Sequence, residues 1–324
     1  MIEEATPDKQ VTSDASAWAM LLLVGLGVAA LQFRSPLAIE QSSLRSLALA
    51  CAVLSGTAIF YRYVRPEEKF AVMCIGLMQV LLFSVLGAVF SYLLAREGGA
   101  LWDDRFTAWD HALGFDWLAY VRLVDSHAWM TLLFRYAYVS LIPQVIVLVL
   151  VLGFTLRLAA LRSTLLAAIV SGSVIVLLSP LFPAVSNFIH LGLTAADFRN
   201  VNPHAGYLHL AHFTALRDGS MTMLRLTEMQ GIITFPSYHA GLATVTCWGF
   251  WRSGVTALRW GGCSLALLTI AATPVDGGHY LVDVLAGVAI GALSVAVARR
   301  AVFWAPGLSL RALPFRRSRA ASAQ

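Results

Sequence analysis

Two short stretches in the last third of the chain place histidine beside residues that can activate it. His239 follows Pro236 and Ser237 at the start of an apolar run, where Ser237 can cap a helix whose free N–H groups favour an anion. His279 lies four residues before Asp283, so on a helix the two side chains share one face. A carboxylate bonded to one imidazole nitrogen makes the other a better nucleophile or base. The pattern predicts acid–base or nucleophilic chemistry.

The composition indicates which elements must hold these residues. The chain of 324 residues is 58% hydrophobic and only 13% charged, whereas soluble domains carry roughly a quarter charged residues. This excludes an ordinary cytosolic enzyme, a disordered chain and a disulfide scaffold. We therefore predict an all-α polytopic membrane protein of about eight transmembrane helices. The apolar runs that predict these helices are 17–33, 44–64, 70–94, 129–153, 161–186, 237–253, 256–275 and 279–303.

The distribution of Lys and Arg predicts the orientation in the membrane. In alternate loops, 14 of the 23 basic residues fall on one side and 8 on the other, and Arg135 lies within a predicted span. Lys and Arg accumulate on the cytoplasmic side. We expect an integral protein of the cytoplasmic or plasma membrane with cytoplasmic termini. Both long loops, 95–128 and 187–236, and the face shared by His239 and His279 are then extracytoplasmic.

The net charge of +5 indicates a membrane surface as partner, and no nucleic acid. The basic residues form no patch along the chain as a whole. Six arginines follow or end the last apolar run, where a basic tail binds anionic lipid. They are Arg299, Arg300, Arg311, Arg316, Arg317 and Arg319.

The two long loops carry further polar residues. His204, His209 and His212 raise the possibility of a zinc site, but their spacing matches no zinc template and no carboxylate follows at helical spacing. We expect no metal and no cofactor. The segment 101–129 mixes aromatic and acidic residues, which is typical of a helix in the headgroup region, so a connecting role is favoured over a catalytic one for any single Asp.

The stretches around the two histidines resemble two signatures of a known family. Pro-Ser-Tyr-His at 236–239 and Gly-Gly-His-Tyr-Leu-Val-Asp at 277–283 resemble the second and third signatures of the type 2 phosphatidic acid phosphatase superfamily. More narrowly, Phe-Pro-Ser-Tyr-His-Ala at 235–240 resembles the branch of the inositol phosphorylceramide synthases, the aureobasidin-resistance proteins. The histidines are about forty residues apart, with an apolar run between them.

The resemblance implies a membrane-embedded, metal-independent lipid phosphate phosphatase or phosphotransferase that forms a phosphohistidine. The matching positions make His279 the nucleophile, Asp283 its orienting partner, and His239 the acid and base for the departing and accepting oxygens. Ser237 and Gly278 are then expected at the substrate phosphate. The implied partners are a lipid phosphate or phospholipid and an acceptor, either water or an alcohol such as inositol. The same triad serves both acceptors.

The sequence departs from the family at the cations that neutralise the phosphate. The first signature, Lys-x6-Arg-Pro, has no match near the end of the run 161–186, and Ala272 and Thr273 replace the Ser-Arg of the third signature. Arg217 and Arg225, upstream of the second signature, are the predicted phosphate-binding residues.

Another arginine could bind the phosphate, and the loop arginines could have a structural role instead. Arg135, beside Tyr136 and Tyr138 in a predicted span, is a further candidate cation. A salt bridge with Asp218 or Glu228 is the structural alternative for the loop arginines.

The resemblance divides the chain into four parts. They are a polar N-terminal tail (1–16), two additional transmembrane helices (17–66), a six-helix core (70–303) and a basic cytoplasmic tail (304–324).

A transporter or channel that relays protons through intramembrane His and Asp is the alternative function. Such proteins show paired repeats or broken helices in two halves, and the sequence has no evident repeat.

Overall fold

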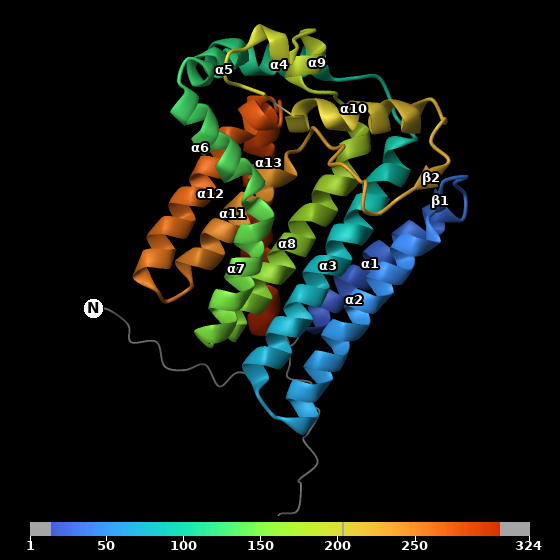
Figure 1. Cartoon of the computed structure of the whole chain (residues 1–324), viewed down its shortest axis with the longest axis vertical. Coiled ribbons are helices and arrows are strands. Elements are labelled where there is room, and N and C mark those ends of the chain that lie inside the picture. The colour runs from blue at the N-terminus through green and yellow to red at the C-terminus, as the bar shows by residue number, and fades with distance from the viewer. Residues whose placement is uncertain (1–13, 203, 305–324) are drawn as a thin grey trace, which may run out of the picture.

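A bundle of long helices forms the body of the protein, and short helices cover one end of it (Figure 1). The computed structural model describes residues 14–202 and 204–304, so most of the polar N-terminal tail and all but Trp304 of the basic tail lie outside the described residues. A chain in lipid forms helices because only a helix satisfies its backbone polar groups within one segment. The long helices are α1 (Ala15–Gln32), α2 (Gln41–Ile59), α3 (Glu68–Ala95), α8 (Leu158–Leu178), α12 (Thr256–Asp276) and α13 (Leu281–Trp304), and the shorter α11 (Tyr238–Trp251) lies among them.

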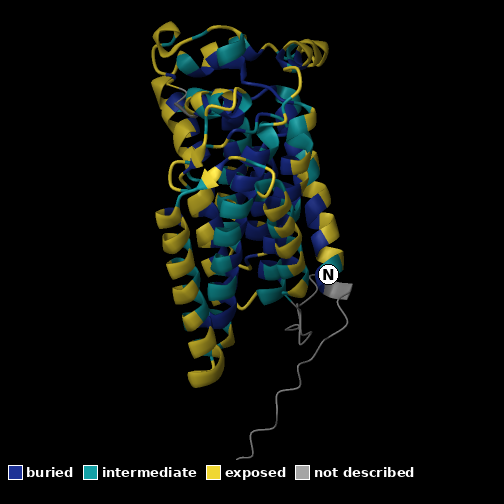
Figure 2. Cartoon of the chain, turned by 90° about the vertical axis from the view of Figure 1, so that its right-hand side faces the viewer, coloured by how far each residue is buried: buried dark blue, intermediate teal, exposed yellow. Residues whose placement is uncertain are grey.

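The helical membrane architecture is confirmed. Within the described ranges, six helices are long and apolar enough to cross a membrane, or seven if the bent pair α6 (Ala128–Val139) and α7 (Leu141–Phe154) is one span. Exposed residues follow the outer faces of the long helices (Figure 2). Many of them are large and apolar, such as Leu22, Leu267 and Leu293, as a lipid-facing surface requires.

The predicted span 129–153 is a broken one. Its two halves, α6 and α7, are bent by 55° where they meet at Ser140. Three residues later, Pro143 has no N–H to donate to the carbonyl of Val139, and its ring crowds that carbonyl. The proline therefore accounts for the break, which brings α6 over the end of the bundle where the long loops lie.

The predicted span 237–253 is the short central helix α11. Its 14 residues are fewer than the 17–25 that a span needs, and it packs among α7, α8, α12 and α13. Glycines bring α11 and α13 into backbone contact: a Cβ on Gly287 would meet the carbonyl of Ser237, and one on Gly291 that of Gly241. Small residues permit such close approach in membrane proteins. The start of α11 is thereby fixed against the start of α13.

The long loops fold together at one end of the bundle (Figure 1). The segment 101–129 contains two short helices where one connecting helix was expected. The second long loop is joined to the N-terminal helices by two parallel strands, with Ala38 opposite Met223. The short elements are β1 (Ala38–Ile39), η1 (Phe60–Val64), α4 (Asp103–Ala112), α5 (Trp117–Asp125), η2 (Ser179–Leu181), α9 (Asn187–His190), η3 (Ala195–Asp197), α10 (His204–Arg217) and β2 (Met223–Leu224).

Candidate active site

His239 lies in the first turn of α11, at the loop-covered end of the bundle. Ser237 precedes this helix as its N-cap and accepts a hydrogen bond from the N–H of Ala240 at 3.4 Å. The imidazole stacks on the ring of Tyr138 from α6, with centroids 4.1 Å apart and an interplanar angle of 11°. The Tyr138 hydroxyl lies 3.4 Å from Nδ1 of His239. Both the helix start and the ring therefore orient this histidine.

His279 lies in the tight turn between α12 and α13. Gly278 has a φ of +67°, and a Cβ there would press on Ser186 and Phe188, so the turn requires glycine. Oδ2 of Asp283 accepts the N–H of Tyr280 at 2.9 Å and lies 3.4 Å from Nδ1 of His279. His279 precedes the helix that was expected to carry it, but the first turn of α13 still brings Asp283 to its ring.

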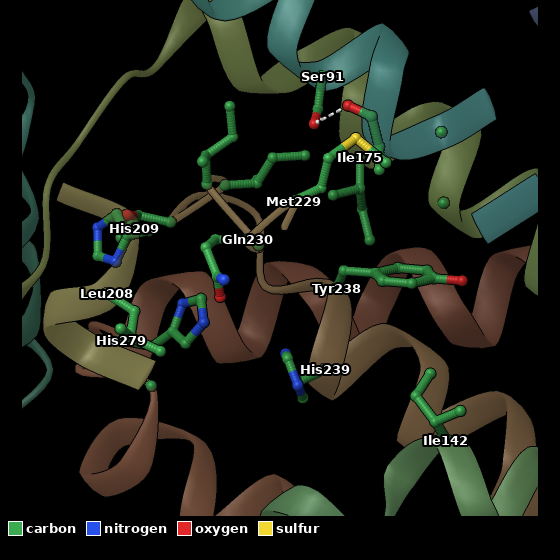
Figure 3. A pocket seen from close by; sticks show the side chains of 18 of the residues that line it. Ser91, Ile142, Ile175, Leu208, His209, Met229, Gln230, Tyr238, His239 and His279 are labelled. Carbon is green, nitrogen blue, oxygen red and sulfur yellow. Dashed lines mark hydrogen bonds between the residues drawn. The ribbon is translucent and has the colours of Figure 1, made fainter. Parts of the chain in front are cut away.

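Both histidines line one cavity of about 500 Å³. Figure 3 shows the two imidazoles entering it from separate segments, with Gln230 close by. The deeper wall is apolar and comes from spanning helices, with Phe83 of α3 and Ile175 of α8 among its residues. The upper wall comes from the second long loop and mixes apolar residues with four polar ones, which are Asn202, His209, Gln230 and Thr234. The cavity can therefore hold a molecule with a polar head and an apolar tail.

The charge state of His279 suits a nucleophile. Burial lowers the pKa of His279 to about 4, although a hydrogen bond with the backbone of Thr234 acts in the opposite direction. The imidazole is then neutral at neutral pH. With a proton on Nδ1 directed at Asp283, the lone pair belongs to Nε2.

The comparison with known proteins identifies the family. The family model of the PAP2 superfamily matches residues 104–297 of the chain. The chain belongs to the PAP2 superfamily. No curated protein and no solved structure matched it. The assignment confirms the resemblance at the level of the superfamily, whose members are phosphatases and phosphotransferases, and so makes the chain a membrane enzyme that acts on phosphoryl groups.

The structure of this PAP2 enzyme places the two predicted phosphate-binding arginines away from the cavity. Arg217 donates from Nη2 to the carbonyl of Gly99, at 2.5 Å. Arg225 is exposed and forms ion pairs with Glu40 at 3.3 Å and Glu228 at 3.1 Å. The pair with Glu228 matches the structural alternative predicted for this residue. Neither arginine lines the cavity.

The two other residues that were predicted to bind phosphate, Ser237 and Gly278, do not line the cavity of this PAP2 enzyme. Ser237 is fully buried as the cap of α11, and Gly278 forms the turn behind His279. Gly277, and not Gly278, lines the cavity. In the structure, Ser237 and Gly278 therefore fix the backbone on which the two histidines are placed.

Arg135 is the arginine that the PAP2 fold brings to the cavity. Of the lining residues in the described part of the chain, it is the one Lys or Arg, and Asp276 is the one carboxylate. The sequence made Arg135 a further candidate beside the loop arginines and indicated no role for Tyr138, which stacks on His239 from a position 101 residues earlier. Arg135 and Tyr138 are three residues apart, about one helical turn, and this spacing could have indicated that both face the same site.

The side chain of His204 lies outside the described residues, and His209 and His212 belong to no cluster of metal ligands within them. No group of three or more His, Cys, Asp or Glu side chains there could hold a metal ion. His209 lies with Nε2 2.6 Å from the carbonyl of Val185, and Nδ1 of His212 lies 2.7 Å from the hydroxyl of Tyr92. These contacts hold α10 against the end of the bundle.

Proposed function

We propose that this PAP2 enzyme cleaves a lipid phosphate through a covalent phosphohistidine on His279. The observation that supports this most strongly is that His239 and His279 line one cavity, with Asp283 behind His279 at its Nδ1. In the first step Nε2 of His279 attacks phosphorus, a P–N bond forms, and the P–O bond to the leaving group breaks. His239, reacting in its protonated form, donates its proton to the departing oxygen and becomes neutral.

The second step returns the site to its starting state. His239 accepts a proton from water or an alcohol, and the resulting oxygen nucleophile attacks phosphorus. The P–N bond breaks and His279 recovers its lone pair, while Asp283 keeps the ring in one tautomer. Water gives a phosphatase and an alcohol such as inositol gives a phosphotransferase.

The substrate charge requires positive partners within the cavity. Arg135 supplies one, and the N-terminus of α11 next to His239 supplies backbone N–H groups and the positive end of the helix dipole. Phosphoryl transfer depends largely on such positioning and charge stabilisation. The apolar wall formed by residues such as Phe83 and Ile175 provides a place for a lipid chain.

The branch within the superfamily and the sidedness are part of the same proposal. The stretch at 235–240 favours an enzyme similar to the inositol phosphorylceramide synthases. The excess of Lys and Arg on the opposite side favours a site on the extracytoplasmic face.

A trapping experiment tests the proposed reaction. Purified protein is mixed with lipid phosphates labelled in the phosphate, with and without inositol, and quenched without acid. We expect label on the wild-type protein and on the control His111→Ala, whose histidine lies in an exposed part of α4, and none on His279→Ala. Absence of both label and turnover with every lipid phosphate would contradict the proposal. Products formed with inositol decide between hydrolysis and transfer.

A further inference from the structure

The short helix α4 lies over the end of the bundle where α13 begins (Figure 1). Asp103 and Asp110, seven residues apart, lie on one face of this helix and are only 3% and 2% exposed. Asp104, between them on the opposite face, has a side chain that is 95% exposed. Buried carboxylates are costly unless several hydrogen bonds compensate for lost water. The partners of Asp103 and Asp110 therefore indicate why α4 carries them.

Asp110 binds the start of the helix that carries Asp283. Its Oδ2 accepts the N–H of Leu281 at 2.8 Å and its Oδ1 accepts the N–H of Val282 at 3.0 Å. The first N–H groups of a helix have no partner within the helix, and the helix dipole favours a negative charge there. Asp110 thus caps α13 from a position 171 residues earlier in the chain.

Asp103 binds the residue that follows His279 and the segment behind it. Its Oδ1 accepts the hydroxyl proton of the fully buried Tyr280 at 2.8 Å. The same carboxylate accepts the N–H of Val185 at 3.1 Å and that of Ser186 at 3.4 Å. Ser186 has a φ of 140°, a backbone conformation that residues other than glycine rarely adopt. The bonds to Asp103 therefore hold a strained backbone in place.

The segment held by Asp103 also supports the residue before His279. The N–H of Asn187 donates to the carbonyl of Gly278 at 2.9 Å, and a Cβ on Gly278 would lie only 3.1 Å from that of Ser186. His279 is therefore fixed on both sides through α4: by Tyr280 and α13 on one side, and by Gly278 on the other.

We propose that Asp103 and Asp110 are positioning residues of the phosphoryl-transfer reaction, through which α4 sets the place of His279. They touch neither the cavity nor the reacting atoms. The inference rests on the proposed function, because it assigns α4 a role in presenting the nucleophile. A displacement of about 1 Å at a nucleophile can lower the rate about 100-fold without weakening substrate binding.

The test compares Asp103→Asn and Asp110→Asn with the control Asp104→Asn from the exposed face of the same helix. We expect kcat to fall 10- to 100-fold in the first two variants, with KM within about twofold of wild type, and the rate of label transfer to His279 to fall by the same factor. Asp104→Asn stays at wild-type values. Asp110→Ala should be worse than Asp110→Asn, because the amide oxygen still accepts one of the two N–H bonds.

Hydrogen exchange measured by mass spectrometry on the same proteins separates the inference from the proposed function. We expect faster exchange in residues 278–284 of Asp110→Asn, with α8 unchanged as evidence that the bundle is folded. Wild-type kcat together with unchanged exchange in both Asn variants overturns the inference, and so does a rise in KM at constant kcat. If wild type shows neither turnover nor label, the proposed function fails, and the exchange of 278–284 alone decides whether α4 fixes this turn.

Discussion

At the scale of single residues, each imidazole of the site is oriented by a side-chain partner. His239 stacks on Tyr138, with the hydroxyl near Nδ1, and His279 directs Nδ1 at Asp283. In the proposed reaction Nε2 of His279 is then the nitrogen that attacks phosphorus. Division of labour between a nucleophile and an acid–base group requires this arrangement, because one histidine cannot serve both roles at the same moment.

Arg135 provides the test of how the site binds phosphate. Arg135→Ala should lower kcat/KM with a lipid phosphate by about 100-fold, because it removes a positive charge from the cavity wall. Arg217→Ala and Arg225→Ala should remain within about threefold of wild type, since both side chains lie outside the cavity. Steady-state kinetics on the three variants decide this. An equal loss of kcat/KM in Arg225→Ala and Arg135→Ala would contradict this prediction and indicate that the loop arginine binds phosphate.

The pKa of His279 predicts how its reactivity depends on pH. Burial lowers this pKa to about 4, so the neutral ring is present above that pH and is lost as the pH falls through it. Diethylpyrocarbonate reacts only with neutral imidazole. Its rate at His279, followed by peptide mass spectrometry, should be half-maximal near pH 4, whereas N-acetylhistidine loses reactivity near its ordinary value of about 6.5. A midpoint for His279 near 6.5 contradicts the prediction.

At the scale of elements, the site depends on how closely α11 and α13 approach each other. These two helices carry His239 and Asp283, and their glycines let the backbones touch. The distance between His239 and His279 therefore depends on glycines that have no side chain at this contact. Any added volume at this contact acts on catalysis as well as on stability.

Gly287→Ala measures this dependence. The new methyl group meets the carbonyl of Ser237, so the helices must separate, at a cost of about 1–3 kcal/mol in the free energy of unfolding. Turnover should fall by at least tenfold, because His239 moves away from His279. Gly56→Ala in α2 is the control, since nothing lies within 4 Å of its added Cβ. Thermal unfolding in detergent and an activity assay should separate the two variants; similar behaviour would contradict the role of the contact.

At the scale of the whole molecule, the sequence predicts the bundle well because hydrophobic runs report directly on lipid exposure. It also predicts the meeting of His279 and Asp283, which depends on local spacing. It does not predict the role of Asp110, whose partners Leu281 and Val282 follow 171 and 172 residues later. Nor does it predict the ion pair of Arg225 with Glu40, which lies 185 residues earlier, just before α2. Contacts between distant loops leave no periodic pattern in the chain.

The charge distribution predicts an orientation for the whole molecule, and this prediction can be tested directly. If the end covered by α4 and α10 is extracytoplasmic, a cysteine at the exposed position of Asp104 should react with a membrane-impermeant maleimide in intact cells. A cysteine at Thr256, exposed at the opposite end of the bundle, should react only after the cells are opened. The unsubstituted chain, with Cys51, Cys74, Cys247 and Cys263, gives the background. The reverse labelling pattern would place the candidate site in the cytoplasm and so change the pool of lipid phosphates and acceptors that it can meet.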